Sequence, residues 1–189
     1  MMETILQWDA AGFHAINQGW SSPVLDFFLI AARNKYVWVP LYVLALSWMV
    51  FNLSVRQWLL TFLFIALAIF ASDTISSELI KKQVKRLRPC AELTLEPSAI
   101  QRVQCGSGYS FTSSHATNHF CLAAFMMMVF GSYMKRWKYL WWLWAFIVAI
   151  AQVYVGVHYP LDVLCGGLVG VMIGWSAGVL CRHWIKPAF

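Results

Sequence analysis

A histidine and an aspartate four residues apart are the strongest indication of chemistry in this chain. His158 and Asp162 are separated by Tyr159, Pro160 and Leu161. A carboxylate at this spacing can orient the imidazole and raise its basicity, which makes the histidine a candidate nucleophile. A lone histidine beside an apolar segment is more often interfacial, but an aspartate at the start of such a segment is costly and requires a reason. We therefore predict that His158 is catalytic and that Asp162 orients it.

A second polar cluster precedes another apolar segment. Ser113, Ser114 and His115 stand where a helix is expected to begin. A helix N-terminus offers free backbone amides and a positive dipole end to an anion, and the Ser113 hydroxyl adds a donor. By itself the cluster is more typical of an N-cap serine followed by an interfacial histidine. His119 lies four residues beyond His115, but no nearby carboxylate or cysteine completes a metal site, so none is predicted.

Two cations form the third candidate group. Lys81 and Arg88 are seven residues apart, about two helical turns, and can project from one side if the helix continues that far. Pro89 disfavours helix at Arg88 itself. Two cations at this separation can hold the oxygens of a phosphate, although a basic segment that only touches lipid headgroups has the same composition.

Composition places these residues in a membrane protein. Of 189 residues, 60% are hydrophobic and only 12% are charged, compared with about 25% charged in soluble domains. The net charge of +6 comes from short basic clusters between apolar segments, so nucleic acid is not an expected partner and anionic membrane lipid is.

An all-α bundle of about five transmembrane helices is expected, because several apolar segments approach 20 residues. The predicted spans are Val37–Leu53, Trp58–Leu79, Ser114–Tyr133, Tyr139–Gly156 and Leu161–Leu180. Two shorter helices, Thr4–Asn17 and Pro23–Arg33, are predicted to lie at the interface. We treat residues 1–189 as one domain, with 1–35 interfacial and 36–182 the transmembrane core. No cleaved leader is expected, because the N-terminus lacks a basic start and a small-residue cleavage site.

The last predicted span carries a glycine at every fourth position: Gly166, Gly170, Gly174 and Gly178. Such a stripe allows another helix to approach closely, either within the chain or in a homodimer. Alternating the span directions places the three polar clusters on the same face of the membrane.

Together the three clusters resemble the motifs of the type-2 phosphatidic acid phosphatase superfamily, whose membrane members include lipid phosphate phosphatases and polyprenyl diphosphate phosphatases. The resemblance covers about residues 36–182. The first family motif is lysine, six residues, arginine and proline, and Lys81, Arg88 and Pro89 match it in full.

The other two motifs match in part. The second reads proline, serine, glycine, histidine, whereas residues 112–115 read threonine, serine, serine, histidine. The third reads serine, arginine, five residues, histidine, three residues, aspartate. His158 and Asp162 are retained, but Ala151 and Gln152 replace the first two residues. The missing arginine is the main departure.

The resemblance implies a role for each matching residue. His158 would attack phosphorus to form a phosphohistidine, Asp162 would orient it, and His115 would protonate the leaving oxygen and later activate water. No metal or other cofactor is implied. The phosphate would be bound by Lys81, Arg88, Ser113, Ser114 and Gln152.

Gln152 donates a hydrogen bond but no charge, and losing one charged donor costs on the order of 10²-fold in rate. The chain is therefore expected to be a slow enzyme, or to draw the missing charge from Arg86 or Arg102 in the loop.

A lipid phosphate is the expected substrate. Family analogy favours a polyprenyl diphosphate and leaves phosphatidic acid, phosphatidylglycerophosphate and lipid A phosphates open. The alternative function is a catalytically weak protein that binds or transports a lipid phosphate. A purely structural membrane protein would leave His115, His158 and Asp162 without a shared purpose.

Charge alone does not orient the chain, because both faces are basic. The face opposite the site carries Arg56, Lys135, Arg136, Lys138, Arg182 and Lys186, as expected of a cytoplasmic face. The resemblance places the site on the outer, extracytoplasmic face of a bacterial inner membrane. A disulfide between Cys90 and Cys105 in the site loop would support this orientation, whereas unpaired thiols would leave it open.

Overall fold

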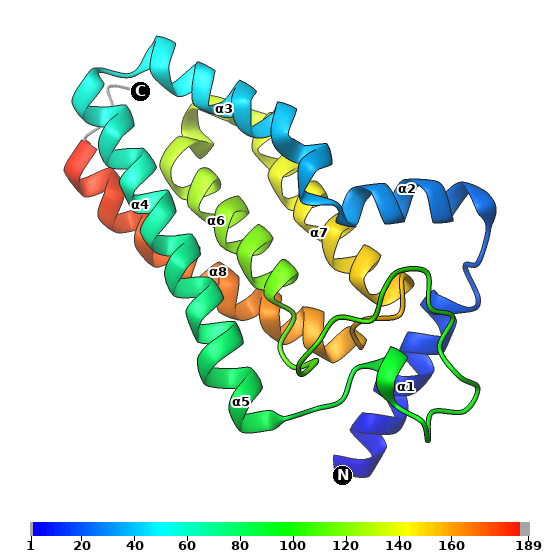
Figure 1. The fold of residues 1–189 in the computed structure, drawn as a ribbon. Helices are drawn as coiled ribbons and strands as arrows, with labels where there is room; N and C mark the ends of the chain where they lie inside the picture. Colours follow the sequence, from blue (N-terminus) through cyan, green and yellow to red (C-terminus); the bar gives the residue numbers. More distant parts are fainter. Residues whose placement is uncertain (1, 186–189) are drawn as a thin grey trace.

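The computed structural model describes residues 2–185, and all regular structure within that range is helical (Figure 1). The expected all-α class is confirmed. The helices are α1 (Met2–Asn17), α2 (Pro23–Arg33), η1 (Lys35–Trp38), α3 (Val39–Asn52), α4 (Val55–Thr74), η2 (Ile75–Ile80), α5 (Lys81–Val84), η3 (Pro89–Ala91), α6 (Ser114–Met134), η4 (Lys135–Lys138), α7 (Tyr139–Tyr154) and α8 (Pro160–Ile185).

Each of the five predicted spans corresponds to a helix, but the helices differ in length. Within residues 2–185, two helical segments are long and apolar enough to cross a membrane, Val55–Val84 with 30 residues and Pro160–Ile185 with 26. Helices α3 and α7 have 14 and 16 residues. The number of spans and the interfacial position of α1 and α2 therefore stay predictions. Lys186 lies outside the described residues.

Short polar residues define where several helices begin. Ser22 caps α2 by accepting the Leu25 amide, and Pro23 occupies the first turn. Ser54 and Gln57 form a capping box at the start of α4. These caps satisfy amides that have no partner inside the helix.

Helix α4 continues through the wider π-helical segment η2 into α5 and ends at Val84. Lys85 takes a left-handed conformation with φ 51° and closes the helix. Arg88 is extended, with φ −78° and ψ 150°, as its position before Pro89 predicts. The condition for Lys81 and Arg88 to project from one continuous helix is therefore not met, and the effect predicted for Pro89 is observed. The turn after Val84 places Arg88 on a loop instead.

The glycine stripe of α8 packs against α6 of the same chain. A Cβ atom added at Gly170 would lie 2.1 Å from the Thr117 carbonyl oxygen, and one at Gly174 would lie 2.0 Å from that of Cys121. Only hydrogen atoms fit between the two backbones. This contact accounts for the stripe within one chain. It also joins the start of α8, with Asp162, to the start of α6, where the Ser113 amide donates to the Asp162 carbonyl at 3.0 Å.

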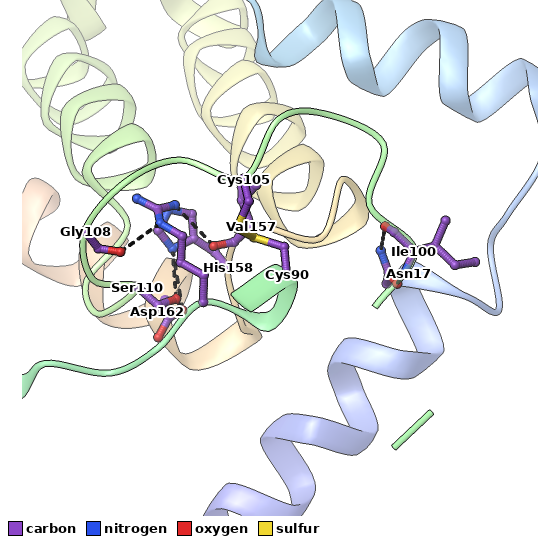
Figure 2. Close-up of a disulfide and its surroundings, with 10 residues drawn as sticks. Asn17, Cys90, Ile100, Cys105, Gly108, Ser110, Val157, His158 and Asp162 are labelled. Atoms are coloured by element: carbon purple, nitrogen blue, oxygen red, sulfur yellow. Dashed lines mark hydrogen bonds and ion pairs between the residues drawn. A yellow bond between two sulfur atoms is a disulfide. The ribbon is translucent and has the colours of Figure 1, made fainter. Parts of the chain in front are cut away.

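A buried asparagine fixes the long loop between α5 and α6 on the helices. The Asn17 side chain donates to the carbonyls of Ile100 and Tyr154 at 2.9 and 2.8 Å, and accepts the Ile100 amide at 2.8 Å (Figure 2). Arg102 reinforces this junction through Asp26, the Asn17 carbonyl and the Tyr154 carbonyl. The loop is thereby held beside α1 and the end of α7 (Figure 1).

We predict that Gly174→Val destabilises the protein by about 1–3 kcal/mol or more, because the new side chain forces α6 and α8 apart. Thermal unfolding in detergent measures the effect. Met172→Val on the exposed side of the same helix, where Met172 is 62% exposed, serves as the control and should change stability by no more than about 0.5 kcal/mol. Equal stabilities of the two variants would contradict the packing argument.

Candidate active site

The Asp162 carboxylate is fully buried, and both of its oxygens have partners from other segments. Its Oδ2 accepts the Tyr159 amide at 2.8 Å and the Ser110 hydroxyl, and lies 3.5 Å from Nδ1 of His158. Its Oδ1 accepts Nη1 of Arg86 at 3.0 Å. The carboxylate and Ser110 thus hold the Nδ1 side of the imidazole (Figure 2). The opposite nitrogen, Nε2, is left for chemistry.

Arg88 lies on the Nε2 side of His158. Its Nη1 is 3.3 Å from that nitrogen and donates to the Val157 carbonyl at 3.3 Å. Its Nε donates to the Gly108 carbonyl at 3.3 Å. Two backbone carbonyls therefore aim the guanidinium at the position that a phosphate approaching Nε2 would occupy.

Burial lowers the pKa of His158 to about 4, although the neighbouring Asp162 carboxylate acts in the opposite direction. The imidazole is neutral at neutral pH, as a nitrogen nucleophile must be. The charges of Arg88 and Lys81 also lower this pKa.

We predict that the His158 imidazole in the unliganded protein stays neutral until the pH falls to about 4. Nitrogen NMR of histidine-labelled protein in detergent, with His158→Gln to assign the signal, measures this directly. Protonation of His158 near its ordinary pKa of 6.5 would show that the site is open to water and would contradict the described burial.

An ion pair behind the site involves a residue that sequence reasoning did not select. Arg86 bridges Asp162 and the buried Asp9 of α1, with Nη2 2.7 Å from Asp9 Oδ2. Its guanidinium also stacks 3.8 Å from the ring centre of Tyr159. Asp9 in turn accepts the Leu161 amide at 2.7 Å. In the sequence, Asp9 is distinguished only as an acidic residue within a helix of mixed polar and apolar residues, which is not enough to select it as part of a site.

The serine and histidine cluster lies at the start of α6, as predicted. Ser113 is buried and acts as the N-cap, accepting the Ala116 amide. The Ser114 hydroxyl lies 3.1 and 3.0 Å from the hydroxyls of Ser76 and Ser77 in η2. His115 lies close enough to His158 and Lys81 for their charges to act on it.

The other predicted phosphate-binding residues lie around the same centre. Lys81 interacts electrostatically with Arg88 and Asp162. Gln152 is fully buried, and its Oε1 accepts Nε of Arg33 at 3.2 Å. Arg33, at the end of α2, was not selected from the sequence, because nothing in its local pattern separates it from a basic residue ending a helix.

The charge of the site is positive. Within residues 2–185, no carboxylate oxygen lies within 4.0 Å of Lys81, Arg88 or Arg33. Arg86, in contrast, is held between two aspartates, and Arg102 is paired with Asp26 at 2.5 Å. The two loop arginines expected to supply extra charge are thus both neutralised by carboxylates, and three half-buried cations remain for an anion.

Cys90 and Cys105 form a disulfide in the loop that carries the site (Figure 2). The bond closes a segment of 15 residues between Arg88 and Gly108, and the Cys90 amide donates to the Gly156 carbonyl at 3.1 Å. The disulfide therefore fixes both ends of the segment that aims Arg88. The other cysteines, Cys121, Cys165 and Cys181, are free.

We predict that protein purified without reductant and then denatured exposes three of its five thiols to alkylation, and all five after reduction. Intact mass measures both. Cys90→Ser should expose one further thiol without reductant. It should also lower the free energy of unfolding by about 3 kcal/mol, because the disulfide no longer constrains the unfolded chain. Five reactive thiols before reduction would contradict the pairing.

Comparisons with known proteins find similar sequences and similar folds. Residues 58–188 match the PAP2 superfamily. A lipid A 4'-phosphatase from Bacteroides thetaiotaomicron is 34% identical over 160 residues, covering 83% of this chain and 70% of that protein. The crystal structure of Aquifex aeolicus LpxE has 26% identity and a TM-score of 0.62, covering 87% of this chain and 91% of that one.

A further solved structure shares the fold. It is described as the first transmembrane PAP2 type phosphatidylglycerolphosphate phosphatase from Bacillus subtilis. Its TM-score is 0.69 at 20% identity, and the match covers 98% of this chain and 88% of that chain.

Proposed function

The chain belongs to the PAP2 superfamily, and we propose that it removes phosphate from a membrane lipid through a covalent intermediate on His158. Lipid phosphatase activity follows from the family and its relatives. The assignment of the nucleophile rests on one observation. His158 is clamped at Nδ1 by Asp162 and Ser110, while Nε2 faces the Arg88 guanidinium at 3.3 Å.

In the first step, Nε2 of His158 attacks phosphorus and forms a nitrogen–phosphorus bond. The bond from phosphorus to the lipid oxygen breaks, and that oxygen takes its electron pair and a proton from His115. Lys81 and Arg88 stabilise the charge on the phosphoryl oxygens. Ser113, Ser114 and Gln152 complete the proposed phosphate-binding set.

In the second step, His115 takes a proton from water, and the water oxygen attacks the phosphohistidine. The nitrogen–phosphorus bond breaks, inorganic phosphate leaves and neutral His158 is restored. Asp162 stabilises the imidazolium that forms during each attack, because its carboxylate faces Nδ1. The proposed cycle uses no metal.

A phosphate monoester on a lipid A type glycolipid is the substrate we propose. The similarity to a lipid A 4'-phosphatase supports it, whereas the polyprenyl diphosphate favoured by family analogy gains no support from the relatives. Phosphatidylglycerophosphate ranks second, since a phosphatidylglycerophosphatase is also similar.

The protein is integral to the membrane, as its two long apolar helices and its transmembrane relatives indicate. We propose that residues 1–189 form one domain in a bacterial inner membrane, with the site on the extracytoplasmic face. The Cys90–Cys105 disulfide supports this orientation, because such bonds persist in oxidising compartments. We also propose that the protein can form a homodimer. Its contact would lie away from the glycine stripe of α8, because that stripe packs against α6 of the same chain.

We predict phosphate release by the detergent-purified protein from lipid A in the presence of chelator, with weaker release from phosphatidylglycerophosphate, phosphatidic acid and a polyprenyl diphosphate. His158→Ala should reduce the rate by on the order of 10³-fold or more, because it removes the nucleophile. His183→Ala, which removes an exposed histidine in the last turn of α8, is the matched control.

Three outcomes would redirect this proposal. Release from no lipid at all would favour a protein that binds or transports a lipid phosphate. Equal turnover by His158→Ala and the control would refute the covalent mechanism but not the phosphatase activity. Activity that is lost only when chelator is added would refute the proposed metal independence.

A further inference from the structure

Arg33 is the last residue of α2, and its side chain turns inward to a neutral partner. Its Nε donates to Oε1 of Gln152 at 3.2 Å. Gln152 is fully buried in α7, so the guanidinium lies at the wall of the site. An ordinary arginine at a helix end remains in water beside the terminal carbonyls.

The Arg33 guanidinium keeps free donors. Within residues 2–185 its one hydrogen bond uses Nε, so neither Nη1 nor Nη2 has a partner there. Half-burial lowers the pKa of Arg33 from its ordinary value, but arginine stays protonated. A half-buried cation with two unused nitrogens is costly without a ligand.

The position of Arg33 relative to the catalytic residues follows from its electrostatic neighbours. Its charge acts on Arg88, whose pKa is lowered first by burial and next by Arg33. It also acts on His115. Arg88 contacts Nε2 of His158 at 3.3 Å. Arg33 is therefore a neighbour of Arg88, as Lys81 is, and Arg88 in turn contacts the nucleophile.

Three like charges repel, and within residues 2–185 no carboxylate oxygen lies within 4.0 Å of any of the three to pair with them. This repulsion is relieved when a doubly charged anion binds between them. Two guanidinium nitrogens in one plane match two phosphoryl oxygens, which a lysine at the same place would not.

We propose that Arg33 binds a phosphoryl group of the substrate through Nη1 and Nη2, with Gln152 acting as the positioning residue that holds its Nε. The proposal rests on the proposed phosphatase function and adds a residue from α2, outside the stretch 58–188 that matches the family. The charge absent from position 152 thus comes from a separate helix that packs against α7.

The experiment compares Arg33→Gln, which keeps a polar group but removes the charge, with Arg33→Lys, which keeps the charge but not the paired geometry. Lys35→Ala removes an exposed cation two residues away, outside the site, and is the matched control. Each variant is assayed for kcat, KM and competitive inhibition by inorganic phosphate, together with its thermal unfolding in detergent.

Arg33→Gln should lower kcat/KM by on the order of 10²-fold, and should raise the inhibition constant for inorganic phosphate by about 10- to 100-fold. Arg33→Lys should lie between Arg33→Gln and wild type. Adding Gln152→Arg to Arg33→Gln should restore part of the loss, because it returns a cation to the same place. Thermal stability should match that of Lys35→Ala.

Two results would overturn the proposal. Arg33→Gln could retain wild-type turnover, or it could lose stability with no change in phosphate inhibition, which would make Arg33 purely structural. A wild-type protein that releases no phosphate would refute the proposed function instead. In that case direct titration of inorganic phosphate into wild type and Arg33→Gln decides whether Arg33 binds the anion.

Discussion

The buried carboxylate of Asp162 is the group on which the arrangement of the site depends. Removing an ionised carboxylate from water costs several kcal/mol unless charges and hydrogen bonds compensate it. Here the compensation comes from the Tyr159 amide, Ser110, Arg86 and His158. Because these partners lie on separate segments, satisfying one carboxylate fixes the turn before α8, the long loop and the nucleophile together.

The same principle extends outward from Asp162. Arg86 carries the connection to Asp9 in α1, and the Asp162 carbonyl accepts the Ser113 amide at the start of α6. The glycines of α8 make that second contact possible, since any larger residue would separate the two backbones. The close packing of α6 against α8 therefore also sets the geometry of the site. Through Asp9, the short helix α1 supports the site as well.

The cations divide into two groups by their partners. Arg86 and Arg102 are bound to aspartates and connect parts of the structure. Lys81, Arg88 and Arg33 have no such partner among residues 2–185, and Arg88, the neighbour of the other two, contacts the imidazole. Cations paired with a carboxylate stabilise the folded protein without a ligand, whereas cations that lack such a partner stabilise an anion bound in the site. This distinction requires distances and cannot be made from residue type.

The sequence by itself determined the helical class, the approximate helix bounds and the pairing of His158 with Asp162, because apolar segments and short spacings act locally. It also selected Lys81 and Arg88, but it left open whether one helix carries both, and the helix ends at Val84, before Arg88. The tertiary structure contains the Cys90–Cys105 disulfide, which the sequence had left open. It alone decided which arginines are neutralised, and that Asp9, Ser110 and Arg33 belong to the site. These contacts join residues far apart along the chain, so no local pattern could indicate them.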